Sequence, residues 1–185
     1  ATGRFDCQAF CGAEKTGPCC RKTGHSFSSA FGMDQWYFAY GSNLLASQMV
    51  RRTGPLQTGA NAPRRATLAN YRVAFNHRGT DGMIYANIVT PGDGVLGVVY
   101  RCSKAALAKL DRFETGYERR EVSVVDQLGN TLTAIAYVGK PDSIAAAGRP
   151  SDEYLARIVD GAREYGLPEE YIETIVERAK GMLKG

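Results

Sequence analysis

Two short segments of this 185-residue chain combine residue types that could do chemistry, and each lies where a predicted strand and a predicted helix meet. The first is Tyr40-Gly41-Ser42-Asn43-Leu44, which continues an aromatic run. A glycine at a strand end lets the backbone turn sharply and approach a ligand closely. A helix that follows directs unpaired amides and a positive dipole end at the loop, which suits a carboxylate or phosphate. With one glycine and no following lysine, the loop indicates either a site for one small anion or an ordinary strand–helix turn.

The second segment, residues 110–118, places Glu114 between a predicted helix and a predicted strand, and such junctions often turn side chains into clefts. Glu114 directly follows Phe113 and lies near Tyr117. A carboxyl group in a partly apolar cleft has a raised pKa, which a general acid–base needs near neutral pH. The alternative is a surface glutamate close to its neighbouring arginines, which are Arg112, Arg119 and Arg120.

The strands that must position these segments follow from the hydrophobic pattern and the turn residues. Short runs rich in apolar, aromatic and β-branched residues predict strands at residues 36–40, 71–75, 83–90, 95–101, 119–126 and 131–138. The first strand ends at Gly41, and a Pro-Gly-Asp-Gly turn at 91–94 precedes the fourth. Residues 127–130 predict a hairpin that joins the last two strands.

Helices are predicted between these strands and at the C-terminal end. Apolar residues at helical spacing continue to residue 50, and either Ser42 or Asn43 suits the N-cap of that helix. Three more helices are indicated: 104–113 capped by Ser103, one from Ser151 to Gly166, and one with Pro168 in its first turn. Strands and helices interleave irregularly, which predicts a mixed α+β domain and not a doubly wound sheet.

Length and composition indicate an ordinary soluble globular protein. Hydrophobic residues make up 44% and charged residues 23% of the chain, and the length suits one domain. These values exclude a long disordered protein, a collagen-like repeat and a coiled coil. No apolar run approaches the roughly 18 residues that a membrane span needs, so no membrane association is expected.

Charge is distributed unevenly, although the net charge is only +4. Residues 36–80 contain no Asp or Glu and six arginines, which are Arg51, Arg52, Arg64, Arg65, Arg72 and Arg78. A solvated face, a nucleic-acid surface and a general attraction for anionic small substrates are the alternatives. Basic pairs alone carry little information, so no nucleic-acid partner is predicted.

Cysteines divide the chain at about residue 35. Four of the five, Cys7, Cys11, Cys19 and Cys20, precede this point and only Cys102 follows it. We therefore expect residues 1–35 to form an irregular Cys-rich extension and residues 36–185 to form the catalytic domain. The extension could be disordered with incidental cysteines, a small metal knuckle that includes His25, or a disulfide-bonded segment. No metal is assigned to the catalytic part.

Three other reactive side chains are given structural roles. Ser42 is not within a Gly-x-Ser-x-Gly elbow, so it is expected to support or contact a ligand and not to act as a nucleophile. His77 is expected at a strand end in a loop or on the surface. Cys102 is expected to be a buried core thiol.

The two chemical segments together resemble the γ-glutamylcyclotransferase family. The loop from Tyr40 to Leu44 is similar to the family's substrate-binding signature, and Leu110-Asp111-x-x-Glu114 is similar to its catalytic segment. Residues 91–100 resemble the turn and strand that lead to that segment. The resemblance continues at the C-terminal end through Tyr154, Ile158, Gly161, Ala162, Glu164, Gly166, Leu167, Pro168, Glu170 and Tyr171.

The resemblance implies a fold and a reaction. The fold is an α+β domain in which flanking helices surround a small, mostly antiparallel, closed or nearly closed β-sheet, with the cavity at the mouth of that barrel. The reaction is intramolecular: the α-amine of a γ-glutamyl amino acid attacks its own γ-carbonyl, which releases 5-oxoproline and a free amino acid. The family needs no cofactor for this step.

The resemblance also implies roles for individual residues. Glu114 would be the general acid–base, and the loop Gly41–Leu44 would bind the substrate's α-carboxylate through backbone amides. Tyr40 or a loop amide would donate to the carbonyl oxygen as negative charge develops. Tyr117 and Tyr137 would line the pocket, with strand aromatics in the core as the alternative for Tyr137.

Related activities and the cellular context remain open at this stage. A γ-glutamylamine cyclotransferase would share the base and the loop, and a non-catalytic small-molecule binding module on the same scaffold is the alternative from a different class. The expected partner is a small γ-glutamyl substrate, and a homodimer is left open. A cytoplasmic location is the default expectation, because no targeting or anchoring signal is visible.

Overall fold

The structure is a computed structural model that describes residues 34–181. Seven strands are present: β1 (Gln35–Ala39), β2 (Arg64–Leu68), β3 (Arg72–Arg78), β4 (Ile84–Val89), β5 (Val95–Cys102), β6 (Tyr117–Asp126) and β7 (Thr131–Gly139). The helices are α1 (Ala46–Thr53), α2 (Lys104–Asp111), α3 (Asp152–Glu164) and α4 (Glu169–Ala179), with single 3₁₀ turns at Ser42–Leu44, Gly59–Asn61 and Pro141–Ser143. Cys7, Cys11, Cys19, Cys20 and His25, for which the sequence left three alternatives open, lie outside the described residues.

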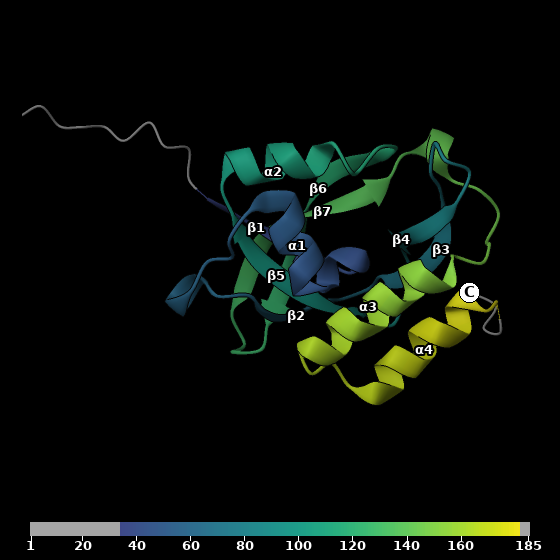
Figure 1. The fold of residues 1–185 in the computed structure, drawn as a ribbon. Coiled ribbons are helices and arrows are strands. Elements are labelled where there is room, and N and C mark those ends of the chain that lie inside the picture. The colour runs from purple at the N-terminus through teal and green to yellow at the C-terminus, as the bar shows by residue number, and fades with distance from the viewer. Residues whose placement is uncertain (1–33, 182–185) are drawn as a thin grey trace, which may run out of the picture. The chain divides into compact units, whose positions relative to one another are not determined.

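Five of the strands close into a barrel in the order β1-β5-β2-β6-β7 (Figure 1). The pairings within it are antiparallel except for β1 with β7, where Trp36 lies opposite Ala134 in a parallel register. The predicted α+β class with a closed, mostly antiparallel sheet is therefore confirmed. A barrel has no free sheet edge, so its inward side chains form one continuous core.

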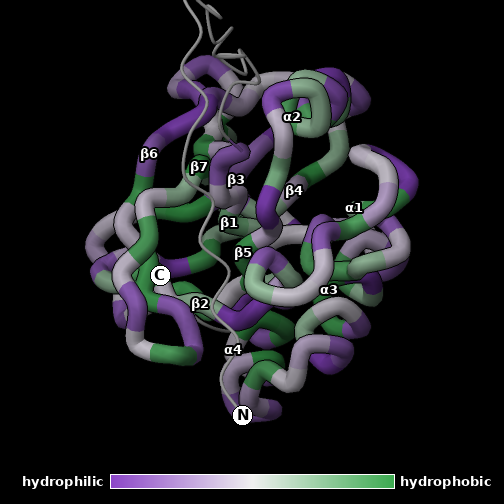
Figure 2. The backbone as a smooth tube through the Cα atoms, turned by 90° about the vertical axis from the view of Figure 1, so that its left-hand side faces the viewer, coloured by the Kyte–Doolittle hydropathy of each residue, from purple (hydrophilic) through white to green (hydrophobic). Residues whose placement is uncertain are grey.

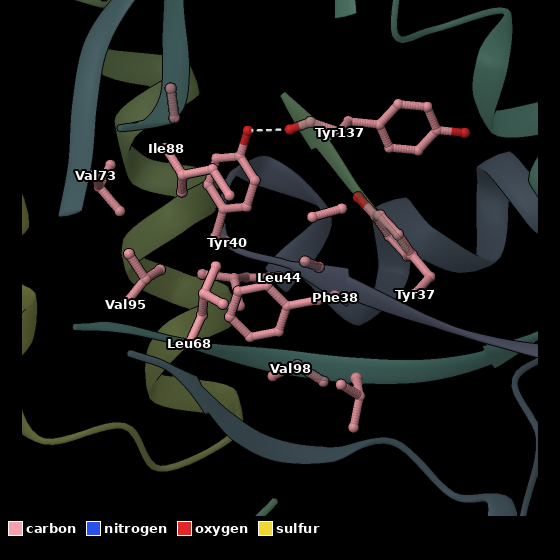
Figure 3. Packing of buried hydrophobic residues seen from close by; sticks show 14 of the residues in the cluster. Tyr37, Phe38, Tyr40, Leu44, Leu68, Val73, Ile88, Val95, Val98 and Tyr137 are labelled. Atoms are coloured by element: carbon pink, nitrogen blue, oxygen red, sulfur yellow. Dashed lines mark hydrogen bonds between the residues drawn. The ribbon is translucent and has the colours of Figure 1, made fainter. Parts of the chain in front are cut away.

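The barrel interior contains the aromatic run that precedes the first chemical segment. Tyr37, Phe38 and Ala39 of β1 are buried, and Figure 3 shows Phe38 beside Val98 and Leu68 of neighbouring strands. Figure 2 shows hydrophobic stretches along the strands and hydrophilic stretches at the turns. Cys102 is buried and has a free thiol, as predicted.

Strand β2 was not predicted from the sequence, because two arginines dominate its five residues. Its burial alternates, with Ala66 and Leu68 facing the core. Arg64 lies over the ring of Trp36 at 4.4 Å and pairs with the buried carboxylate of Asp126 at 2.8 Å. The Arg64 guanidinium group therefore covers part of the outside of the barrel. Arg64 and Arg65, which the sequence showed only as a basic pair, belong to a strand.

Strands β3 and β4 form a separate two-stranded sheet. The register shifts between Phe75 and His77, so that an extra residue bulges out of β3. Val73, Phe75 and His77 share the buried face of β3. The expectation of a loop or surface histidine is wrong: His77 is 1% exposed and stacks on Tyr117 with ring centroids 3.7 Å apart.

Helices α3 and α4 lie beside each other, next to the β3–β4 sheet (Figure 1). The Ser151 side chain caps α3 by accepting from the amide of Tyr154 at 3.2 Å, as predicted. Pro168 is the N-cap residue of α4. Within residues 34–181, no helix is long and apolar enough to cross a bilayer.

Gly161 lets α3 lie directly against the loop that follows β1. A Cβ atom at this position would lie 2.3 Å from the Leu45 nitrogen and 2.4 Å from the Leu44 carbonyl carbon. Both are backbone atoms and cannot rotate away. The close approach places the face of α3 that carries Tyr154 next to the loop.

Replacing Gly161 with Ala is expected to lower the free energy of unfolding by about 1–3 kcal/mol, the usual range for overpacking. The sign is informative, because helix propensity alone would favour alanine by about 1 kcal/mol. Denaturant unfolding measures the effect, with the adjacent exposed substitution Asp160→Ala as the control. Increased stability of Gly161→Ala would contradict the described contact.

Candidate active site

A cavity of about 230 Å³ opens beside the loop that follows β1. Its lining comes from that loop, the ends of β3 and β4, the start of β6 and the N-terminal half of α3. Tyr40, Gly41, Ser42, Asn43, Glu114, Tyr117 and Tyr137, all predicted as site residues, contribute to it. The volume is small compared with the roughly 300–1,000 Å³ of pockets for drug-sized ligands, so it suits a compact molecule.

Leu44 is the predicted site residue that does not line this cavity. Its side chain is 1% exposed and lies in the core, and its carbonyl accepts from the Tyr100 hydroxyl at 3.0 Å. The reason is the 3₁₀ turn over Ser42–Leu44, which rotates successive side chains by about a third of a turn. Asn43 therefore faces the cavity and Leu44 faces the barrel interior.

The loop does not begin α1 in the predicted way. Leu45 is the N-cap residue, and neither Ser42 nor Asn43 caps the helix. The amide of Ala46 instead donates to the Glu164 carboxylate of α3 at 3.1 Å. Because a carboxylate of the protein occupies the start of α1, the loop backbone and not the α1 dipole is available to a ligand.

Freed from capping, the Asn43 amide connects β1 to the second chemical segment. Its Nδ2 atom donates to the Tyr37 hydroxyl at 2.7 Å and to Glu114 Oε1 at 3.0 Å. Its Oδ1 atom accepts from Arg52 at 2.8 Å and from Gln48 at 3.2 Å. All of its polar atoms are used, so the orientation of the amide is fixed.

Glu114 is held inside the cavity and not on the surface. Its side chain is 13% exposed, and its carboxylate lies 3.3 Å from Arg52 Nη1. Two of the three neighbouring arginines considered from the sequence are engaged elsewhere, since Arg119 pairs with Asp111 and Arg120 pairs with Glu118. The surface alternative for Glu114 is therefore wrong.

Arg52 was not predicted as a site residue, because the sequence showed it only as one of six arginines in an acid-free stretch. It projects from the last turn of α1 and bonds both Asn43 and Glu114. Its guanidinium also lies 4.7 Å from the Phe113 ring centroid, which restricts its movement. No spacing rule relates positions 52 and 114, so only the fold could reveal this pair.

The environment of Glu114 raises its pKa. Burial has the largest effect and favours the protonated form, while the positive charge of Arg52 and the Asn43 hydrogen bond act in the opposite direction. The Asp111 carboxylate adds a further upward shift. The result is a carboxyl group whose pKa is raised toward the range in which it can both take and return a proton.

Several tyrosine hydroxyls around the cavity already donate to acceptors of the protein. Tyr40 donates to the Tyr137 carbonyl oxygen (Figure 3), and Tyr117 donates to the Ala86 carbonyl at 2.6 Å. The Tyr137 hydroxyl points away from Tyr40 and donates to Asp111 at 2.9 Å. A hydroxyl has one proton, so these three tyrosines present rings and not donors to a ligand.

Tyr154 has the opposite arrangement. Its hydroxyl oxygen accepts from the Ala86 amide at 3.2 Å. Burial raises its pKa to about 12, although the hydrogen bond from Ala86 acts against the shift. The hydroxyl therefore keeps its proton at neutral pH and can donate it into the cavity. Sequence reasoning noted Tyr154 only as part of a C-terminal pattern.

Gly41 is needed beside this hydroxyl. A Cβ atom at position 41 would lie 3.1 Å from Tyr154 Oη and 3.7 Å from the Ala86 Cβ atom. The backbone at Gly41 has φ of −107°, so the requirement is space and not a left-handed conformation. The loop backbone and the Tyr154 hydroxyl can thus approach the same ligand atom.

Comparison with known proteins agrees with this geometry. Residues 94–175 match the AIG2-like family. The chain is 36% identical to human (Homo sapiens) gamma-glutamylcyclotransferase over 149 residues, which is 75% of this chain and 76% of the human one. It is 33% identical to the mouse (Mus musculus) gamma-glutamylcyclotransferase over 147 residues, with 75% and 76% covered.

A solved structure leads to the same assignment. A gamma-glutamyl cyclotransferase aligns with a TM-score of 0.67 and 31% identity, over 77% of this chain and 86% of that chain. The match to the AIG2-like family includes the segment that carries Glu114. The chain belongs to the gamma-glutamylcyclotransferase family.

Proposed function

We propose that this protein converts γ-glutamyl amino acids into 5-oxoproline and a free amino acid. The observation that carries the proposal is the position of Glu114, a buried carboxyl group held by Asn43 and Arg52 in a small cavity beside the loop at Gly41. The relatives that bear the name of this activity support it.

Glu114 would act as base and then as acid. An α-ammonium group has no lone pair, so a carboxylate must first remove a proton. The amine then forms a bond to the γ-carbonyl carbon, the bond from that carbon to the leaving nitrogen breaks, and Glu114 returns the proton to that nitrogen. The attacking nitrogen loses a second proton as it becomes the lactam N–H, and the released amine takes up a second proton to become an ammonium, so the protons balance and the step consumes neither water nor cofactor.

The loop would hold the substrate in the folded-back shape that cyclisation requires. The backbone of Gly41, Ser42 and Asn43 faces the cavity and would bind the α-carboxylate, while Leu44 only anchors the loop in the core. Fixing the α-carboxylate also fixes the α-amine next to Glu114. Closing a flexible chain into a near-attack arrangement in advance removes much of the entropic barrier.

Tyr154 would donate to the γ-carbonyl oxygen as it gains negative charge. The candidate considered from the sequence was Tyr40, but its hydroxyl already donates a hydrogen bond to the Tyr137 carbonyl oxygen. The Tyr154 oxygen is oriented by the Ala86 amide, and its proton is available. Tyr117 and Tyr137 would shape the cavity with their rings, because their hydroxyls bond to Ala86 and Asp111.

The activity is tested by assaying 5-oxoproline release from γ-glutamyl amino acids, γ-glutamyl amines and glutathione. We expect turnover of γ-glutamyl amino acids. Selective turnover of amines would make the protein a γ-glutamylamine cyclotransferase. Binding without 5-oxoproline release from any substrate would contradict the proposal and favour a binding module.

Arg52 gives a prediction for the pH dependence. Replacing Arg52 with Met removes the positive charge that lowers the pKa of Glu114, so that pKa should rise further. Because Glu114 must be ionised to accept a proton, the acidic limb of kcat should move to higher pH, by roughly 1 unit or more. The measurement is kcat against pH for wild type and variant.

The adjacent Arg51 provides the matched control. It lies on the same helix and bonds only weakly to Ser47, at 3.5 Å. Arg51→Met should leave the acidic limb in place. An unchanged limb in Arg52→Met, or one that moves to lower pH, would show that Arg52 does not set the protonation of Glu114.

A further inference from the structure

The cavity is also lined by four polar side chains that the proposed chemistry does not use. They are His77 of β3, Asp81 of the β3–β4 turn, Tyr85 of β4 and Arg157 of α3. The centroid of the Tyr85 ring lies 6.4 Å from that of His77 and 5.0 Å from that of Tyr154. Side chains from three separate elements therefore meet in this part of the lining.

Two buried nitrogens among these side chains lack a partner from the protein. Among residues 34–181, the buried side-chain nitrogen and oxygen atoms without a hydrogen bond are His77 Nδ1 and Arg157 Nε. Both residues line the same cavity. Buried polar atoms are nearly always paired, because an unpaired one costs stability. Arg157 Nε always carries a proton, so its lack of a partner indicates that an acceptor of a ligand completes it.

Arg157 is oriented to receive an anion. Its Nη1 atom bonds the exposed Glu153 at 2.8 Å, which anchors one corner of the guanidinium at the rim. The Nε atom is buried in the interior. Anchoring at Nη1 leaves the Nε edge of the planar group, which offers the two parallel donors that match a carboxylate.

Among the charged side chains that line the cavity, Arg157 is the cation whose charge is available to bind such an anion. Of the two guanidinium groups, Arg52 is paired with Glu114. The second lining carboxylate, Asp81, is satisfied by the Tyr85 hydroxyl at 2.5 Å and the Met83 amide at 3.0 Å. Burial lowers the pKa of His77, so His77 is a neutral hydrogen-bonding group and not a second cation.

The substrate's own geometry assigns the ligand. The α-amine and α-carboxylate share one carbon, so both must lie near Glu114 and the loop when the amine is activated. The leaving group is attached on the other side of the γ-carbonyl, so it makes contacts other than those of the α-amine and α-carboxylate. If it is an amino acid, its carboxylate lies one carbon from the breaking bond.

We propose that Arg157 binds the carboxylate of the leaving amino acid and thereby makes the enzyme select γ-glutamyl amino acids over γ-glutamyl amines. The proposal rests on the proposed cyclotransferase activity and specifies its substrate. Arg157 is a specificity residue in this account and takes no part in the proton transfers.

A matched pair of substrates tests the proposal. γ-Glutamyl-alanine and γ-glutamyl-ethylamide differ only by the carboxylate of the leaving group. We expect Arg157→Met to lower kcat/KM for γ-glutamyl-alanine by roughly 10- to 100-fold, as for loss of a hydrogen bond to a charged group. Activity on γ-glutamyl-ethylamide should change by less than about 3-fold, since that substrate makes no such bond.

Arg163→Met is the control, because Arg163 lies on the same helix and pairs with the exposed Glu169 outside the cavity. It should alter neither substrate's kinetics. Equal losses on both substrates in Arg157→Met would overturn the proposal.

The wild-type enzyme tests the same proposal without any variant. The proposal can therefore still be overturned if Arg157→Met fails to fold. Wild type should prefer γ-glutamyl-alanine to the ethylamide. Equal turnover of the two, or a preference for the ethylamide, would overturn the role of Arg157 while the cyclotransferase activity stands. Release of 5-oxoproline from neither substrate would overturn the activity itself, and the specificity proposal with it.

Discussion

Replacing Glu114 with Gln is expected to lower kcat for 5-oxoproline release by about 10²–10⁴-fold, the usual contribution of positioned acid–base catalysis. Glutamine has nearly the same shape and can keep the hydrogen bond from Asn43, but it cannot take a proton from the α-ammonium group. Substrate affinity should change little, because the loop at Gly41 and not Glu114 is proposed to bind the α-carboxylate.

The measurement combines single-turnover kinetics with calorimetric binding of γ-glutamyl-alanine. Glu118→Gln is the control, since Glu118 is exposed at the start of β6 and pairs with Arg120. Retention of wild-type kcat by Glu114→Gln would show that another group moves the protons. Loss of binding together with turnover would instead assign Glu114 to holding the substrate.

The same variant has a predicted effect on stability, and its sign follows from the raised pKa of Glu114. Native protein holds the Glu114 proton more tightly than the unfolded chain does. The stability that this carboxyl group contributes is therefore present in its protonated form and falls as pH rises from the ordinary pKa of glutamate through the raised one. Glu114→Gln should be more stable than wild type at neutral pH, and the difference in Tm should shrink on acidification.

Replacing Tyr154 with Phe is expected to lower kcat by about 10²–10³-fold, the range for loss of one donor to a developing oxyanion. KM should change much less, because the bond to the carbonyl oxygen strengthens mainly as charge develops. Steady-state kinetics with γ-glutamyl-alanine separate the two parameters.

A structural effect of the lost hydroxyl needs its own control. Tyr100→Phe removes a buried hydroxyl that bonds the carbonyl of Leu44, in the same loop but outside the cavity. It should reduce Tm and leave kcat close to wild type. If Tyr100→Phe and Tyr154→Phe lost activity equally, the effect of Tyr154 would come from loop stability and not from donation to the oxyanion.

The strand pattern allowed most of the fold to be predicted, and the exception has a physical cause. Alternating and continuous apolar runs marked every strand except β2, where Arg64 and Arg65 obscured a five-residue alternation. Those arginines are satisfied by tertiary partners, Asp126 and the Gly166 carbonyl, which no local rule can anticipate. The closure of the sheet into a barrel was predicted from the family resemblance and not from the hydrophobic periodicity.

The sequence indicated candidate site residues where one short segment carries the signal. The loop from Tyr40 to Asn43 and the carboxyl group of Glu114 line one cavity, although 71 positions separate Asn43 from Glu114. Leu44 was included because the motif is contiguous, whereas the 3₁₀ turn rotates successive side chains by about a third of a turn and so directs Leu44 into the core. A loop motif identifies a site, and the local backbone decides which of its residues face the ligand.

Residues whose roles depend on distant elements were not predictable. Arg52 reaches Glu114 only because α1 packs beside α2. His77 is buried only because β3 pairs with β4 and the His77 ring stacks on Tyr117. Arg157 shares the cavity-facing side of α3 with Tyr154, three residues earlier. The three-residue spacing of Tyr154 and Arg157 was visible in the sequence, but the cavity that the two side chains line was not.

Turnover of γ-glutamyl-alanine in water enriched in oxygen-18 shows directly whether the substrate's own amine attacks the γ-carbonyl carbon. Cyclisation consumes no water, so we expect 5-oxoproline that carries no label, released in equal amount to alanine. Release of glutamate with one oxygen-18 atom would mean that water is the nucleophile and that the protein is not a cyclotransferase.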